Sequence, residues 1–219
     1  MICTLRHSAS LGLLLFGLLL IPGDLTAQQL YFPFEASVTA NEAETSYEGS
    51  ALAHVLRDDD EHLVELQLTG HAGERSLILS LLARQPGLEL GTYDATAPID
   101  DIRTIQDGFE RLPVDAFVTL AGFSTNPRNE RLSVESGELV IEKVTDVAEL
   151  TDLPGDLTPE ALEELPITNL VEGSITYTLR GEDGTTYRVS GSFKALETVQ
   201  DASDEEGPLH GHPHGGHSH

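Results

Sequence analysis

The sequence is poor in the residues that support thiol and aromatic chemistry. It has a single cysteine, Cys3, and no tryptophan. Cys3 lies in a leader that we expect to be removed, so the mature chain has no disulfide and no cysteine-based metal site. The absence of tryptophan and the presence of only five tyrosines also disfavour a carbohydrate site built on stacked rings.

Basic residues are scarce as well. The chain has 12 Lys+Arg against 37 Asp+Glu, a formal net charge of -25, and its lysines are Lys143 and Lys194. Such a surface repels phosphate backbones and anionic lipid headgroups, which excludes nucleic acid as an expected partner. Such a surface attracts cations and suits concentrated salt, which screens the repulsion between acidic groups. A genome rich in G and C is a second explanation for the preference of arginine over lysine.

The first 27 residues have the layout of a secretory signal peptide. Arg6 and His7 precede an apolar run from Leu11 to Ile21, and small residues follow before Gln28. The run is shorter than the ~20 residues that cross a bilayer as a helix, which disfavours the alternative of an uncleaved anchor. Cys3 precedes the run, so we expect no lipid anchor. We therefore predict a secreted or periplasmic protein with no membrane span after processing.

Residues 28–199 have the pattern of one antiparallel β-domain, either a β-sandwich or a barrel-like fold. Apolar and polar residues alternate along many segments, as in strands with one buried face. The strongest hairpin joins Val171–Arg180 to Thr185–Lys194 through a turn at Gly181–Gly184. Other strands are expected at 32–39, 50–57, 62–69, 76–83, 88–93, 115–123 and 137–144.

One short helix is expected at about 158–165. Thr158 is a good N-cap, Pro159 suits the first helical position, and Glu160 favours the positive end of the helix dipole. Pro166 should end it. We expect this helix to cover one end of the sheet, and a lid over a ligand pocket is the functional alternative. Residues 97–113 read as a loop.

Several strand motifs resemble those of small exported all-β domains of unknown function that are common in Bacteroidota. The motifs that carry this resemblance are 90–93 (Leu-Gly-Thr-Tyr), 136–141, 171–178 and 189–195. The resemblance implies a β-sandwich or barrel at the cell envelope or outside it, and it transfers no catalytic residue. Similar proteins are often lipoproteins, and this chain differs because it lacks a cysteine after the leader.

The last 20 residues, 200–219, form an acidic and histidine-rich tail that should be disordered without a ligand. Neutral imidazole suits zinc, nickel and copper, and the interspersed glycines let several rings meet around one ion. The tail is therefore predicted to bind divalent transition metal. The candidate metal ligands are His210, His212, His214, His217 and His219.

Two weaker metal candidates lie near the first long hairpin. His54 and His62 share a face if its turn has three residues, whereas a two-residue turn would separate them. The separated arrangement, with ordinary histidines at a sheet rim, is the favoured interpretation. The acidic run Asp58–Glu61 could offer oxygen ligands to calcium, but it lacks the spacing of an EF-hand loop and reads as a solvated turn.

No catalytic motif is evident in the sequence. Gly122–Asn126 fails the Gly-x-Ser-x-Gly pattern at its last position, and neither a zinc-protease helix motif nor a phosphate-binding glycine loop occurs. We therefore predict a non-enzymatic exported binding protein with a metal-binding tail and an unknown protein partner. The alternatives are a structural or interaction module with an incidental tail and, less favoured, a hydrolase that uses carboxylates.

Overall fold

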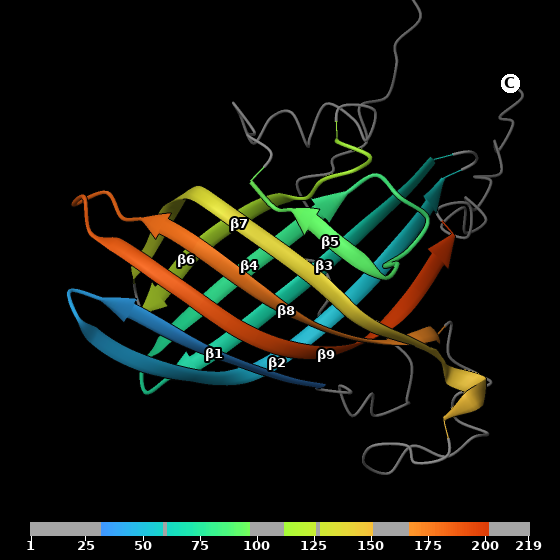
Figure 1. The fold of residues 1–219 in the computed structure, drawn as a ribbon, viewed down its shortest axis with the longest axis horizontal. Coiled ribbons are helices and arrows are strands. Elements are labelled where there is room, and N and C mark those ends of the chain that lie inside the picture. Colours follow the sequence, from blue (N-terminus) through green and yellow to red (C-terminus); the bar gives the residue numbers. More distant parts are fainter. Residues whose placement is uncertain (1–31, 59–60, 97–111, 126–127, 151–166, 202–219) are drawn as a thin grey trace, which may run out of the picture.

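The computed structural model describes residues 32–58, 61–96, 112–125, 128–150 and 167–201 (Figure 1). The expected leader, the expected helix at 158–165 and the histidine-rich tail lie outside these ranges. A 3-10 helix spans Val147–Glu149. The strands are β1 (Phe32–Ala40), β2 (Ala43–Asp58), β3 (Glu61–Ala72), β4 (Arg75–Ala83), β5 (Gly91–Asp94), β6 (Val118–Thr125), β7 (Arg128–Asp146), β8 (Ile167–Arg180) and β9 (Thr186–Asp201).

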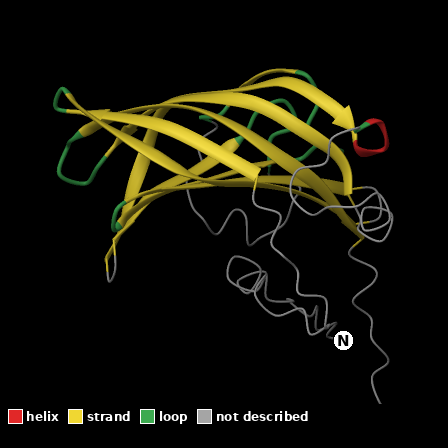
Figure 2. Ribbon diagram, turned by 90° about the horizontal axis from the view of Figure 1, so that it is seen from below, coloured by secondary structure: helices red, strands yellow, loops and turns green. Residues whose placement is uncertain are grey.

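Eight of these strands form a closed antiparallel barrel. β1 to β4 and β6 to β9 pair with their neighbours along the chain, and β9 returns to pair with β1. The short β5 pairs with β7 where β6 no longer reaches it. Figure 2 shows the strands curving around a common interior, with the 3-10 helix at one end. The all-β prediction is confirmed. Of the two predicted architectures, a β-sandwich and a barrel-like fold, the structure has the barrel.

A parallel contact completes the closure between the first and last strands. β1 starts at Phe32, which lies opposite Ala51 on β2. Beyond that point no β1 residue separates β2 from β9, so residues 53–57 of β2 pair directly with residues 197–201 of β9 in parallel register. Backbone groups that the short β1 would leave unpaired are thereby satisfied.

The interior is filled by the apolar residues of the alternating pattern. Leu66 and Leu68 of β3 and Leu77 and Leu79 of β4 are fully buried. Because successive strand residues point to opposite faces, the residues between them, Gln67 and Ile78, face outward. The largest fully buried side chains include two tyrosines and two phenylalanines, namely Tyr47, Tyr177, Phe34 and Phe117.

Of these four residues, Tyr177 has a hydroxyl group that takes part in a chain of hydrogen bonds. Its hydroxyl lies 2.9 Å from Thr119 Oγ1, which donates to the carbonyl oxygen of Ala95 at 2.8 Å. Since the threonine proton is engaged by Ala95, the tyrosine hydroxyl donates to Thr119. The ring lies over Gly137, where an added Cβ would be 2.2 Å from a ring carbon. Glycine at position 137 therefore makes room for the tyrosine.

Long strands bend around the barrel through irregularities in register. β7 shifts relative to β8 between Val134 and Ser136 and again between Ile141 and Lys143. An extra residue in one strand increases its local bend and twist. These two shifts allow the 19-residue β7 to follow the barrel wall instead of leaving it.

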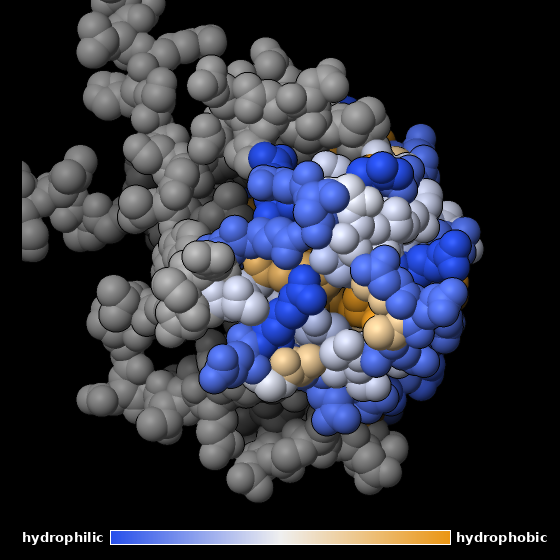
Figure 3. Space-filling model, turned by 90° about the vertical axis from the view of Figure 1, so that its left-hand side faces the viewer, coloured by the Kyte–Doolittle hydropathy of each residue, from blue (hydrophilic) through white to orange (hydrophobic). Residues whose placement is uncertain are grey.

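The two ends of the barrel differ. The end that we call the short-turn end carries the β1–β2, β3–β4, β6–β7 and β8–β9 connections (Figure 1). Seen end-on, it has hydrophilic residues around its rim and apolar ones towards its centre (Figure 3). Arg75 of β4 lies 3.6 Å above the centre of the Phe123 ring and pairs with Glu130 at 3.4 Å. This cation–π contact places a charged group over the core at that end.

The opposite end, which we call the loop end, carries the longer connections. β4 and β7 end there, β6 and β8 begin there, and β1 begins and β9 ends there as well. Loops that join rigid strands are the usual place for binding residues.

The strand boundaries differ from the sequence prediction where polar residues predominate. β2 begins at Ala43 instead of residue 50, and β7 begins at Arg128 instead of residue 137. In these added portions few side chains are buried, with Tyr47 and Leu132 among those that are. Pairing with neighbouring strands, which periodicity does not report, extends both strands.

Candidate ligand-binding mouth of the barrel

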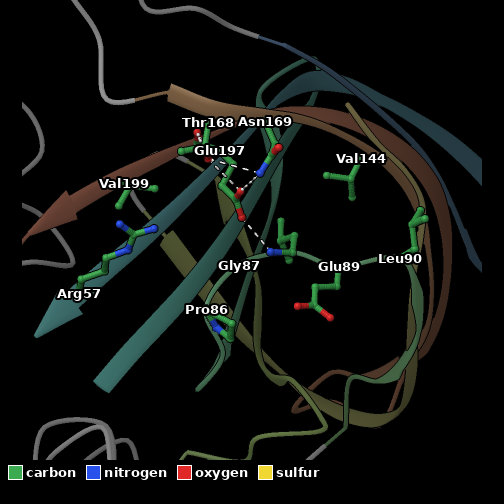
Figure 4. Close-up of a pocket in the computed structure, with 11 residues that line it drawn as sticks. Arg57, Pro86, Gly87, Glu89, Leu90, Val144, Thr168, Asn169, Glu197 and Val199 are labelled. Carbon is green, nitrogen blue, oxygen red and sulfur yellow. Dashed lines mark hydrogen bonds between the residues drawn. The ribbon is translucent and has the colours of Figure 1, made fainter. Parts of the chain in front are cut away.

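A cavity of about 590 Å³ opens at the loop end of the barrel. The segment Pro86–Leu90 forms one side of it, and residues from β2, β7, β8 and β9 form the rest (Figure 4). A cavity in the mouth of a barrel is a common place for a small-molecule site.

Glu197 of β9 lies at the centre of the polar contacts in this cavity. Its side chain is only 3% exposed. Oε1 accepts from the backbone N–H of Leu88 at 2.8 Å, while Oε2 accepts from Asn169 Nδ2 at 2.6 Å and from Thr168 Oγ1 at 3.0 Å (Figure 4). The carboxylate therefore joins the 86–90 segment to β8 and β9.

Local backbone features bring these donors to one carboxylate. Residues 195, 197 and 199 share the inner face of β9 because side chains alternate along a strand, which turns Glu197 inward. β8 shifts register relative to β9 between Ile167 and Asn169, and the two residues Thr168 and Asn169 both reach Glu197 there. A Cβ at Gly87 would lie 2.9 Å from Glu197 Oε1, so glycine permits this close approach.

The charges around Glu197 are not balanced within ion-pair distance. Arg57 of β2 and Glu89 line the same cavity and are both exposed. Figure 4 shows Arg57 on the β2 side and Glu89 on the segment opposite. Among the described residues, no Lys, Arg or His forms an ion pair with Glu197.

Apolar side chains form the remaining wall of the cavity. Leu88 is buried, Val144 and Val199 are partly buried, and Leu90 is 65% exposed. Leu90 and Val114 are the large apolar side chains of the described chain that stand out as exposed. The cavity therefore combines a buried carboxylate with an accessible apolar surface.

The five predicted metal ligands, His210 to His219, lie outside the described residues. β9 ends at Asp201, opposite Arg57 of β2 in the parallel pairing. The last described residue, Asp201, therefore lies at the loop end, where the cavity also lies.

The structure separates His54 from His62. Asp58 pairs with Glu61, which leaves two residues between them, and this register places Glu65 opposite His54 and Arg57 opposite His62. His54 lies on the outer face of the hairpin and His62 lies on its inner face. The interpretation that the two histidines are separated is therefore confirmed.

His54 instead takes part in contacts between strands. Its Nδ1 lies 2.6 Å from Thr198 Oγ1, and that hydroxyl donates to the carbonyl oxygen of Ala53 at 3.2 Å. His54 Nδ1 therefore donates to Thr198. Burial lowers the pKa of His54, and the neighbouring Glu65 opposes this shift.

Acidic residues do not converge into a metal site within the described ranges. No group of three or more His, Cys, Asp or Glu side chains in that part of the chain is arranged to hold an ion. Residues 59 and 60 of the predicted acidic turn lie outside those ranges.

Sequence reasoning did not identify the Glu197 cavity. The signal was present, because Glu197 occupies an inward position in the alternating pattern of β9, between Ala195 and Val199. A charged residue at a core position is rare unless it has partners. Those partners, Leu88 and Asn169, are distant in sequence, and only the fold brings them to the carboxylate.

The described helical residues include no segment that is long and apolar enough to cross a bilayer. No family model matches the sequence, and comparisons with curated proteins and with solved structures find no match.

Proposed function

We propose that this protein is an exported, non-enzymatic binding protein that captures divalent transition metal through its C-terminal histidines. The observation that carries the proposal is the presence of five histidines within the last ten residues, spaced by Gly, Pro and Ser. Neutral imidazoles bind zinc, nickel and copper, and four of them satisfy a tetrahedral zinc ion.

Export is part of the same proposal. The layout of residues 1–27, with a basic start, an apolar run and small residues before Gln28, supports a leader that is removed during secretion. The resemblance of the strand motifs to small exported all-β domains agrees with this. A protein outside the cytoplasm meets metal ions before the cell's interior does, which suits a capturing or buffering role.

The barrel serves in this proposal as a stable carrier for the metal-binding segment. Its last strand is held on one side by β8 and on the other by β1 and β2, so the segment begins from a fixed point. The net charge of -25 raises the local concentration of cations near the surface.

Metal titration of the chain that begins at Gln28 tests the proposal. We expect zinc, nickel and copper to bind, and replacement of the five histidines by glutamine in the full chain to remove this binding. A chain that ends at Ser203 should lose it as well, while keeping β9 intact to Asp201. His71→Gln is the control, because His71 is exposed and contacts Ser76 at the short-turn end.

The result also separates the alternatives. Equal affinity in the parent and in the five-histidine variant would contradict metal capture and favour a structural or interaction module. Calorimetry should report the stoichiometry directly, and the circular dichroism spectrum should stay unchanged because the substituted positions follow the last strand, which ends at Asp201.

A further inference from the structure

We propose that the cavity at the loop end binds a small organic cation, namely a primary amine with an apolar body. This site is distinct from the metal-binding histidines and goes beyond the function proposed above. The buried carboxylate of Glu197 and the apolar wall beside it are the features that would bind such a ligand.

The Glu197 carboxylate is buried among neutral partners. It is almost completely buried, and its hydrogen-bond partners are three neutral donors, from Leu88, Thr168 and Asn169. Buried charges in proteins are normally paired with an opposite charge. A carboxylate has about four lone-pair positions, so one position remains for a further donor.

The space next to that carboxylate has the size and the apolar lining of a small-ligand site. The cavity has a volume of about 590 Å³, which is within the range of small-ligand sites. Leu90, Val144 and Val199 offer it an apolar wall. An ammonium group at Glu197 with a hydrocarbon body along this wall would satisfy both features.

The charge around the cavity is predominantly negative. Glu89 lines the cavity with Glu197, and the whole chain is strongly acidic, so the field there favours a cation over an anion. Arg57 is the opposing group, since it lines the same cavity. Its positive charge would repel a bound ammonium group, so its removal should strengthen the binding of an amine.

NMR titration of the ¹⁵N-labelled chain that begins at Gln28, in the presence of EDTA, provides the test. The probes are hexylammonium, hexanol and hexanoate, which share a hydrocarbon body and differ in the charge of the head. We expect hexylammonium at millimolar concentration to shift the amide signals of Gly87 and Leu88 and to bind more tightly than the other two. Tighter binding of hexanoate, or no shift of these signals with hexylammonium, would overturn the proposal.

Substitutions extend the test. Glu197→Gln keeps the shape and should weaken hexylammonium binding by about tenfold or more, since a buried charge loses its partner. Arg57→Gln, at an exposed position, should strengthen it, which gives a prediction of opposite sign that does not depend on the buried site tolerating change. Glu182→Gln is the matched control because it removes an exposed carboxylate at the short-turn end. An equal effect of Glu182→Gln and Glu197→Gln, or weaker binding in Arg57→Gln, would contradict the assigned site.

Discussion

At the scale of single residues, Tyr177 connects the packing of the barrel to pH. Burial raises the pKa of its phenol, because the phenolate would lose its hydration inside the barrel. In the unfolded chain the same group ionises near its ordinary pKa of 10.0. Above that pH the unfolded state therefore binds fewer protons than the folded state, and the free energy of unfolding falls as pH rises.

Tyr177→Phe should make this alkaline loss of stability shallower. At neutral pH the variant should lose about 1 kcal/mol, because the hydrogen bond to Thr119 is gone. Urea unfolding at about pH 8 and about pH 11, on either side of the ordinary tyrosine pKa, measures both effects. Burial also raises the pKa values of Tyr47 and Tyr93, so the slope should shrink without disappearing. An unchanged slope in the variant would show that Tyr177 does not carry the effect.

At the scale of strands and turns, the β1–β2 connection holds residues in a conformation that suits glycine. Asn41 and Glu42 have φ of 50° and 67°, and they form a two-residue turn because Ala40 pairs with Ala43. Such a hairpin turn needs positive φ at both positions, with Asn-Gly as its preferred sequence. Asn41 fits this preference, whereas Glu42 has a Cβ that opposes the backbone conformation.

Glu42→Gly should therefore stabilise the protein, by about 0.5–1 kcal/mol after the greater freedom of glycine in the unfolded chain is subtracted. The measurement is the urea midpoint. Glu42→Gln separates backbone from charge, since it removes one negative charge and keeps the Cβ. If both variants gain equally, relief of charge repulsion and not backbone strain explains the result.

The strands themselves show how far the sequence predicts this fold. Alternation along 171–180 and 185–194 predicted the β8–β9 hairpin, and Tyr177 and Val189, both on its apolar face, pair with each other. The second strand begins at Thr186, because Arg180 pairs with Thr186 and five residues connect the strands. Alternation reports which face is buried but not how many strands join or which edges meet. The parallel contact between β2 and β9 and the cavity around Glu197 depend on that closure, so no local pattern could predict them.

At the scale of the whole molecule, the excess of negative charge acts against the compact state. With 12 Lys+Arg and 37 Asp+Glu, the formal net charge is -25, and like charges on a folded surface lie closer than in an extended chain. Ion pairs such as those of Glu172 with Lys143 and Lys194 offset little of this, because exposed pairs contribute up to about 1 kcal/mol.

Stability should rise with ionic strength. We expect the urea midpoint to increase as NaCl is added, with most of the change at low salt, because the Debye length falls to about 8 Å at 0.15 M. KCl at the same ionic strength serves as the control and should give the same curve if screening is the cause. A midpoint that stays constant or falls with salt would contradict self-repulsion as a destabilising force.

The parallel contact between β2 and β9 has a consequence for the order in which the molecule is completed. The chain is synthesised from its N-terminus, so β3 becomes available to pair with residues 53–57 soon after these residues are made. Their partner on the other side is the final strand, β9. Until residues 197–201 have emerged, that edge offers free N–H and C=O groups to any neighbouring chain. Synthesis of the last strand therefore removes the edge by which nascent copies would aggregate.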